Sequence, residues 1–201
     1  MRRVEVAAAY GERADEYRER FGSVDQMSPR DRATISAWGR SVAGPVLDVG
    51  CGPGHWGDLI AAESGNDVIG LDASCRFLSA ARRGFPSLRL VAGDLEQLPF
   101  GDDSVGGVLA WFSLIHADPE AVASILGEFT RVLRPTGSLL IGYFEGPARE
   151  PFDHAVATAY YWSADALGEL LRSCGLTVQR ASARQDPGIR RQGDLTAIFR
   201  S

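Results

Sequence analysis

The sequence has 201 residues, of which 45% are hydrophobic and 23% are charged, as is usual for one globular domain. The formal net charge of −5 argues against an electrostatic hold on nucleic acid or on an anionic membrane surface. All 21 basic residues are arginine, so the chain has no lysine for a pyridoxal-phosphate Schiff base or for a P-loop.

Targeting and metal-binding signals are also missing from the sequence. No apolar run approaches the roughly 18 residues that a membrane span needs, and the N-terminal segment lacks the apolar core of a signal peptide. The cysteines Cys51, Cys75 and Cys174 are scattered, without the spacing of a metal or redox site. We therefore expect reduced thiols, no metal and a cytoplasmic location.

The first elements in chain order are helical. Residues 5–40 are polar and helix-prone, and a break at the sequence MSPR separates off a second short helix that ends near Trp38. Tyr10 and Tyr17 share one face of the first helix. They would either close over a bound ligand as part of a lid or make simple core contacts.

From residue 45 onward, strands alternate with helices. Apolar runs predict strands at 45–50, 67–72, 88–94, 104–112 and 137–144. Helical patterns follow at 55–64, from Ser74, from Asp118-Pro119 to about Leu133, and from Ser163 to Cys174 before Gly175. This alternation predicts a doubly wound, mostly parallel α/β sheet with helices on both faces.

The chain closes with two strand-like runs, 176–183 and 194–200, that have no helix between them. They predict an antiparallel hairpin at one edge of the sheet. We interpret residues 1–43 as an N-terminal helical lid and 44–201 as the α/β core of a single domain. Within this core, the linker at 145–162 is the expected site for an acceptor molecule.

The stretch VLDVGCGPGHWG at 46–57 predicts a buried strand, a glycine turn and a helix N-terminus, which together form a cofactor cradle. Glycine lets the backbone turn sharply and approach a ligand closely. The dinucleotide-binding fingerprint requires Gly or Ala where His55 stands, six positions into the turn. Asp48, ahead of the turn, suits a cationic ligand such as S-adenosylmethionine (SAM) better than a pyrophosphate.

Four segments, taken in order, resemble the motifs of class I SAM-dependent methyltransferases that modify small molecules: VLDVGCGPG, VIGLDAS, VAGDLEQLPFGDDSVGGVLAWFSLIH and EFTRVLRPTGSLLI. YGERADEYRERF resembles the tyrosine-bearing N-terminal helix of that family. The resemblance covers residues 5–145. It implies a Rossmann-like fold, SAM as cofactor, S-adenosylhomocysteine (SAH) as product, and methyl transfer to an O, N or C atom of a small-molecule metabolite.

The resemblance also implies roles around the cofactor. Gly50, Gly52 and Gly54 would let the backbone pass under the methionine and ribose portions of SAM. Asp72 would accept hydrogen bonds from both ribose hydroxyls. Asp48 would hold the amino group, directly or through water, or would mainly order the glycine turn. The expected cofactor residues, among them Asp94 and Leu95 beside the adenine, are Tyr17, Arg32, Asp48, Gly50, Cys51, Gly52, His55, Trp56, Asp72, Ala73, Gly93, Asp94, Leu95, Trp111 and Phe112.

Several of these positions have a structural alternative. Arg32 would hold the methionine carboxylate or be an exposed helix arginine. One of Trp111 and Phe112 is expected to be core packing, because adjacent strand residues face opposite ways. His55 and Trp56 would line the site or serve as cap and packing residues.

Three residues are candidates for a catalytic role. His116 follows the fourth strand and would act as general base or position the acceptor, with a hydrogen bond at the helix entry as the alternative. His154 and Tyr160 lie in the linker 145–162, together with Glu145, and are the other candidates for the acceptor site.

The nature of the acceptor is bounded by absent motifs. AWFSLIH follows the fourth strand in place of an Asn/Asp-Pro-Pro-aromatic motif, so we expect no nucleic-acid substrate. We also expect no membrane partner, and a monomer or homodimer. A SAM-binding sensor without methyl transfer and an NAD-dependent oxidoreductase are the alternatives, and His55 and Asp48 disfavour the latter.

Overall fold

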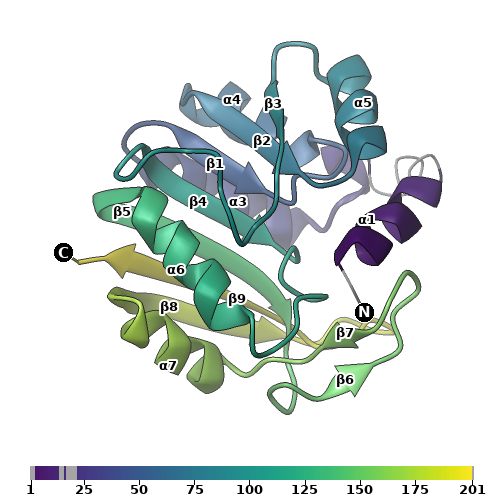
Figure 1. Ribbon diagram of the computed structural model, residues 1–201, viewed down its shortest axis with the longest axis vertical. Coiled ribbons are helices and arrows are strands. Elements are labelled where there is room, and N and C mark those ends of the chain that lie inside the picture. The colour runs from purple at the N-terminus through teal and green to yellow at the C-terminus, as the bar shows by residue number, and fades with distance from the viewer. Residues whose placement is uncertain (1–2, 14–15, 17–21, 201) are drawn as a thin grey trace.

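The computed structural model describes residues 3–13, 16 and 22–200. Its main sheet consists of β1 (Val46–Val49), β2 (Val68–Asp72), β3 (Arg89–Ala92), β4 (Val105–Trp111), β5 (Leu133–Phe144), β8 (Leu176–Arg184) and β9 (Gln192–Phe199). The strand order is β3-β2-β1-β4-β5-β9-β8 (Figure 1). Strands β1 to β5 pair in parallel, and β9 pairs antiparallel with both β5 and β8. The predicted fold class is therefore confirmed, including the antiparallel hairpin at the C-terminal edge.

Helices cover both faces of this sheet. The helices bounded within the described residues are α1 (Arg3–Glu12), the short 3₁₀ helix η1 (Val24–Gln26), α3 (Pro29–Ser41), α4 (His55–Ser64), α5 (Cys75–Gly84), α6 (Val122–Val132) and α7 (Ala164–Ser173). Residues of α6 and α7 pack in one hydrophobic cluster, and residues of α3 and α4 pack in a second. Helix α5 packs beside β2 and β3 at one end of the sheet (Figure 1).

Strand β1 shows why the two faces separate. Its four residues are all buried, as expected for a central parallel strand covered on both sides. Val46 joins the cluster on the α3 and α4 side, whereas Leu47 joins the cluster on the α6 and α7 side. Successive strand side chains point to opposite faces, so one short apolar run supplies both cores.

Helix α3 lies within the segment that we interpreted as a lid, yet it covers the sheet. Its side chains Ile35 and Trp38 are buried in the same cluster as Val46. The indole N–H of Trp38 donates to the hydroxyl of Ser138 on β5, at 2.9 Å. This part of the lid segment thus belongs to the packed layer over the sheet.

The helix starts were predicted with mixed success. Ser74 and Ser163 do cap α5 and α7, where each hydroxyl accepts a backbone N–H of the first turn. Asp118 does not cap the following helix, because α6 begins at Val122. Instead, Asp118 closes a turn in which its carboxylate accepts the N–H of Glu120 at 3.0 Å, and this delays the helix.

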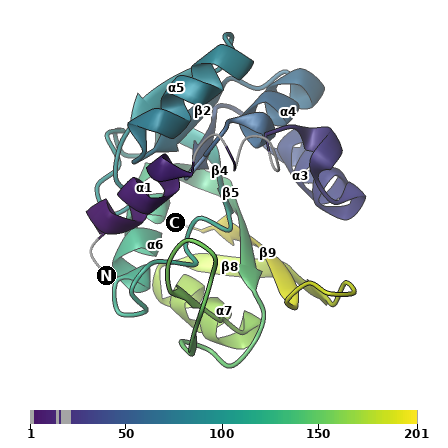
Figure 2. The same ribbon diagram turned by 90° about the vertical axis from the view of Figure 1, so that its right-hand side faces the viewer.

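The segment 145–162 is more ordered than a plain linker. It contains a small antiparallel pair, β6 (Pro151–Phe152) and β7 (Ala159–Tyr160). Figure 1 and Figure 2 show α1 at the edge of the sheet where the parallel strands end. A guanidinium N–H of Arg13, just after α1, donates to the carbonyl of Ala155 in this segment. The two pieces therefore meet at the ligand-binding edge of the α/β sheet.

Candidate functional site

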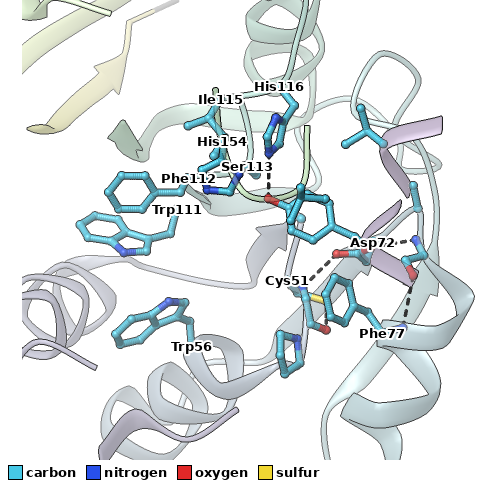
Figure 3. A pocket seen from close by; sticks show the side chains of 18 of the residues that line it. Cys51, Trp56, Asp72, Phe77, Trp111, Phe112, Ser113, Ile115, His116 and His154 are labelled. Carbon is cyan, nitrogen blue, oxygen red and sulfur yellow. Dashed lines mark hydrogen bonds between the residues drawn. The ribbon is translucent and has the colours of Figure 1, made fainter. Parts of the chain in front are cut away.

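A cavity of about 1150 Å³ lies at the carboxyl ends of the parallel strands. Its walls come from the loop after β1, the ends of β2 and β4, the residues after β3, helix α1 and the tip of the β8–β9 hairpin. In Figure 3, Trp56, Trp111 and Phe112 lie along one side, His116 and His154 lie at the top, and Asp72 and Phe77 lie opposite. Ligands bind at this edge in open α/β sheets.

The glycine turn after β1 is held close to its neighbours. Gly50 has φ +69°, and a Cβ there would come within 2.5 Å of the Ser113 side chain, so no larger residue fits. The N–H groups of Gly50 and Cys51 both donate to the carbonyl of Leu71, at 2.7 and 3.0 Å. Gly50, Cys51 and Gly52 all line the cavity, and their contact with a cofactor stays a prediction from the motif.

Asp72, at the end of β2, is hydrogen-bonded to this turn. One carboxylate oxygen accepts the N–H of Gly52 at 2.9 Å, and the other accepts the N–H of Ser74 at 2.7 Å. Burial raises the pKa of Asp72, while these two N–H groups act in the opposite direction. The carboxylate lines the cavity, so it is available to hydroxyl groups of a ligand.

Asp48 is buried behind the cavity wall, whereas direct binding of a ligand would require it to line the cavity. It is 2% exposed and does not line the cavity. Burial, together with the charge of Asp72, raises the pKa of Asp48 to about 7, and the N–H of Gly57 offsets part of this. Its oxygen Oδ2 has no hydrogen-bond partner among the described residues. Of the roles that we considered, ordering of the glycine turn fits this position, and direct contact with a ligand does not.

Most of the other expected cofactor residues do line the cavity. They are His55, Trp56, Ala73, Gly93, Asp94, Leu95, Trp111 and Phe112. His55 is 5% exposed and neither ring nitrogen has a partner within the described part of the chain. Burial lowers the pKa of His55 to about 4, so its imidazole is neutral at pH 7.

Two expected residues, Arg32 and Gly54, lie away from the cavity, and a third is not among the described residues. Arg32 forms an ion pair with Asp25 at 3.3 Å and does not line the cavity, which matches the alternative of an exposed helix arginine. Gly54 caps α4 and faces Ala81 and Leu88 rather than the cavity. Tyr17 lies outside the described residues, so its predicted contact with the cofactor stays a prediction.

Trp111 and Phe112 both line the cavity, and Trp111 also packs against the hydrophobic cluster on the α3 and α4 side, as expected for one of the two. Both side chains reach the cavity because of local backbone geometry. Phe112 has φ +56°, a left-handed conformation that phenylalanine rarely adopts, and its N–H donates to the carbonyl of Gly142 at 3.0 Å. This bend ends the alternation of the strand and turns two successive rings toward the same space.

Aromatic rings follow one another around the wall. Neighbouring ring centroids are 4.7–6.4 Å apart from His55 through Trp56, Trp111, Phe112, Phe144, His154, His116 and Tyr10 to Phe77. All of these residues line the cavity. We call this set the aromatic arc. The glycine turn and Asp72 lie between its two ends.

His116 is held on both ring nitrogens. Its Nδ1 lies 2.8 Å from the carbonyl of Thr158, which requires a proton on Nδ1. Its Nε2 lies 2.8 Å from the hydroxyl of Tyr10 and therefore accepts that hydroxyl proton. Burial lowers the pKa of His116. His116 thus joins α1 to the 145–162 segment. Its ring N–H and its ring lone pair are both taken up by these two hydrogen bonds.

His154 differs from His116 although the two rings are only 5.1 Å apart. It lines the cavity, and its Nδ1 has no partner among the residues that the structure describes. Burial, with the nearby His116 and two arginines, lowers the pKa of His154 to about 4. The ring is therefore neutral at pH 7 and can accept a proton.

The other two candidates in the 145–162 segment do not reach the cavity. Tyr160 lies in β7, where its N–H donates to the carbonyl of Ile115 at 2.8 Å, and it does not line the cavity. Glu145 is likewise absent from the wall, although its neighbour Phe144 forms part of it. A strand places adjacent side chains on opposite sides, which the sequence pattern of this segment did not reveal.

Sequence reasoning missed one wall of the cavity. The tip of the β8–β9 hairpin and the start of α3 contribute Met27, Ser28, Asp31, Arg184, Asp186, Ile189 and Gln192. The Arg184 guanidinium pairs with Asp31 and Asp186 and donates to the side-chain oxygen of Gln192. The only signal in the sequence was a turn-rich run with two arginines, DPGIRRQG, which by itself assigns no role.

The described residues lack a membrane-spanning helix and a metal-binding cluster. None of the helices in the described ranges has both the length and the apolar character needed to cross a membrane. Within the same ranges, no group of three or more His, Cys, Asp or Glu side chains is arranged to hold a metal ion.

Known proteins match this chain mainly in its α/β core. Residues 46–137 match the family model described as a methyltransferase domain. A demethylmenaquinone methyltransferase of Beutenbergia cavernae is 40% identical over 123 residues, which are 61% of this chain and 50% of that protein. An uncharacterized methyltransferase of Synechocystis is 33% identical over 144 residues, which are 67% of this chain and 68% of that protein. The chain thus spans only about half the length of the first of these relatives.

One solved structure extends the likeness over nearly the whole chain. The 1,6-didemethyltoxoflavin-N1-methyltransferase of Burkholderia thailandensis, solved with 1,6-didemethyltoxoflavin and SAH, superposes with a TM-score of 0.75. It is 23% identical and covers 96% of this chain and 85% of its own. The sheet order, the ordered sequence motifs and these matches agree, and the chain belongs to the class I SAM-dependent methyltransferase family.

Proposed function

We propose that this chain transfers a methyl group from SAM to an O, N or C atom of a small-molecule metabolite. The observation that carries the proposal is the cradle formed by Gly52 and Asp72, whose backbone and carboxylate are joined at 2.9 Å on the cavity wall. The cradle lies at the sheet edge where α/β proteins bind nucleotide-like ligands.

The residues present fit SAM. The bare backbone at Gly50 and Gly52 permits close approach by the methionine and ribose portions. Asp72 would accept the ribose hydroxyls, and Asp94 and Leu95 would border the adenine. The acidic side chains around the cavity suit a ligand that carries ammonium and sulfonium charges.

When bound, SAM would supply an electrophilic methyl group on a positively charged sulfur. The protein's contribution would be to align the acceptor with that methyl carbon and to exclude water from the cavity. The acceptor atom would form the new bond to carbon while the sulfur keeps the electron pair of the broken bond. An acceptor that loses a proton in this step needs a base, and His154 is the side chain that we assign to it.

A small acceptor is supported by the dimensions and by the relatives. A cavity of about 1150 Å³ holds a nucleoside-sized cofactor with a compact second molecule. The names of the Beutenbergia and Burkholderia relatives refer to demethylmenaquinone and 1,6-didemethyltoxoflavin, which are small molecules.

The test is a turnover assay with SAM that carries a labelled methyl group and a broad set of small metabolites. The proposal expects transfer of the label to at least one metabolite, with one SAH formed per methyl transferred. The Asp72→Ala variant should lose most of this activity at low SAM concentration. Tight binding of SAM without SAH formation across the set would contradict methyl transfer and favour the sensor alternative.

A further inference from the structure

We propose that the part of the cavity bounded by Phe112, Phe144, His154 and the β8–β9 hairpin tip binds an uncharged, planar aromatic methyl acceptor. This inference rests on the proposed function, because it assigns SAM to the glycine turn and Asp72. The acceptor then occupies the remaining space, over β4, β5 and β9, which we call the acceptor end.

The apolar wall of the acceptor end is made of rings. The centroids of Trp111 and Phe112 are 5.6 Å apart at 89°, and those of Phe112 and Phe144 are 5.0 Å apart at 55°. The ring centroids of Phe144 and His154 are 6.1 Å apart, so His154 continues the row of rings beyond Phe144. These angles expose both ring faces and ring edges, which a flat aromatic ligand can meet in stacked and edge-on contacts. A saturated ligand of equal size lacks the ring electrons that these contacts need.

The charges around the cavity disfavour an anionic acceptor. The carboxylates in the wall are those of Glu12, Glu16, Asp31, Asp72, Asp94 and Asp186. The guanidinium groups in the wall, among the described residues, are those of Arg13, Arg76 and Arg184. The described wall therefore carries more negative than positive charge, and a second anion would be repelled in a partly enclosed space.

Arg184 is the arginine of the hairpin tip that lines the cavity, and its charge is already balanced by carboxylates. Its Nε donates to Asp186 at 2.9 Å, and its two terminal nitrogens bond to Asp31 and Gln192. Its side chain is 9% exposed, and that of Asp31 is 11% exposed. Two carboxylates on one guanidinium leave a net negative group, so Arg184 fixes the hairpin tip to α3 and is not a receptor for an acidic acceptor.

The other two arginines are committed elsewhere. Arg13 makes a two-point pair with Glu16, at 2.9 Å for each nitrogen. Arg76 lies on α5 at the cofactor end and donates to the carbonyl of Gly11 at 3.3 Å.

The hairpin tip itself presents an apolar edge to the opening. Arg190 lies 4.5 Å over the Phe152 ring and donates to the hydroxyl of Tyr161 at 2.7 Å, which anchors the tip to the 145–162 segment. Ile189 lines the cavity and is 49% exposed, and it is the one large apolar side chain exposed to this degree in the described chain. An uncharged ring entering past Ile189 would cover this apolar surface.

The test measures binding to the full chain saturated with SAH, by calorimetry, with three probes of matched size. The probes are 2-naphthol, which is flat and neutral, 2-naphthoate, which is flat and anionic, and decahydro-2-naphthol, which is neutral and saturated. We expect 2-naphthol to bind at least tenfold more tightly than either of the others.

Two variants make the comparison specific. Phe144→Leu should weaken binding of 2-naphthol at least fivefold while leaving decahydro-2-naphthol and SAH unchanged. Asp186→Asn should strengthen binding of 2-naphthoate at least threefold without changing 2-naphthol, because it leaves part of the Arg184 charge unbalanced. Asp102→Asn is the matched control, since Asp102 pairs with Arg131 outside the cavity, and it should change none of the three values.

The two levels of the proposal fail in different ways. If SAH itself does not bind, the proposed function is contradicted. If SAH binds but no aromatic probe does, or if 2-naphthoate or decahydro-2-naphthol binds as tightly as 2-naphthol, the proposed function stands and the acceptor class is wrong. Tenfold selectivity for 2-naphthol with the expected variant effects supports both.

Discussion

The hydroxyl of Tyr10 lies 2.8 Å from Nε2 of His116, so helix α1 is bonded to the loop that follows β4, across the opening of the cavity. The other imidazole nitrogen is 2.8 Å from the carbonyl of Thr158 in the 145–162 segment. One histidine thereby connects three pieces of chain that surround the same space. Its own geometry assigns it to closing the cavity, whereas the buried Nδ1 of His154 has no partner in the part of the chain that the structure describes.

Tyr10→Phe removes the hydroxyl from this connection and leaves the ring. Because a neutral hydrogen bond contributes about 0.5–1.5 kcal/mol, the free energy of unfolding in denaturant should fall by about that amount. SAH affinity should also fall, since α1 would cover the cavity less firmly. Tyr160→Phe, at a tyrosine outside the cavity wall, is the control and should leave SAH affinity unchanged. Equal unfolding free energies for Tyr10→Phe and the unchanged protein would contradict the role of this bond.

Asp72→Ala should weaken SAH binding by about 1–3 kcal/mol, because a charged hydrogen-bond partner is lost and the N–H of Gly52 loses its acceptor. Calorimetry measures the affinity, and circular dichroism checks that the variant is folded. Asp67→Ala is a matched control, since Asp67 precedes the same strand at its opposite end and pairs with Arg89 at the surface. A folded Asp72→Ala variant with unchanged affinity would remove Asp72 from the binding site.

His154→Gln should lower kcat by about 10²–10⁴-fold for an acceptor that must lose a proton, while SAH affinity stays the same. In the unchanged protein, kcat should fall as the pH is lowered toward about 4, where the imidazole of His154 gains a proton. The variant should lack this limb of the pH profile. If the variant keeps both the rate and the limb, His154 is not the base.

The buried imidazole of His55 should make stability depend on pH. Its pKa is 6.5 in the unfolded chain and about 4 in the folded one, so between these values the unfolded state binds more protons. The free energy of unfolding should therefore rise as the pH is raised from about 4 to about 6.5, with about 3 kcal/mol as the upper limit of this contribution. His55→Gln should show a smaller rise over the same range in urea titrations. Parallel curves for the two proteins would contradict a neutral, buried His55.

The fold and the cofactor side of the cavity were predictable because their signals are local. The alternation of short apolar runs with amphipathic segments is enough to predict the parallel sheet and the closing hairpin. The glycine turn and Asp72 also come from short stretches, in which each residue is placed by the strand directly before it. The structure brings Gly52 and Asp72 together because β1 and β2 are parallel neighbours in register.

The acceptor end was not predictable in the same way. Arg184 meets Asp31 across 153 positions of sequence, and this contact exists only once the hairpin folds beside β5. Phe112 lines the cavity because its backbone is left-handed, and no pattern of residues in the sequence predicts that conformation. Asp118 has the composition of a helix cap, but its carboxylate closes a turn instead, which is a competing use of the same hydrogen-bond chemistry.

Calorimetric titration of the unchanged protein with SAM and, separately, with NAD tests the central claim most directly. Our account predicts micromolar or tighter binding of SAM, competition by SAH, and no heat of binding with NAD. Binding of NAD together with no response to SAM would contradict the assignment of this cavity.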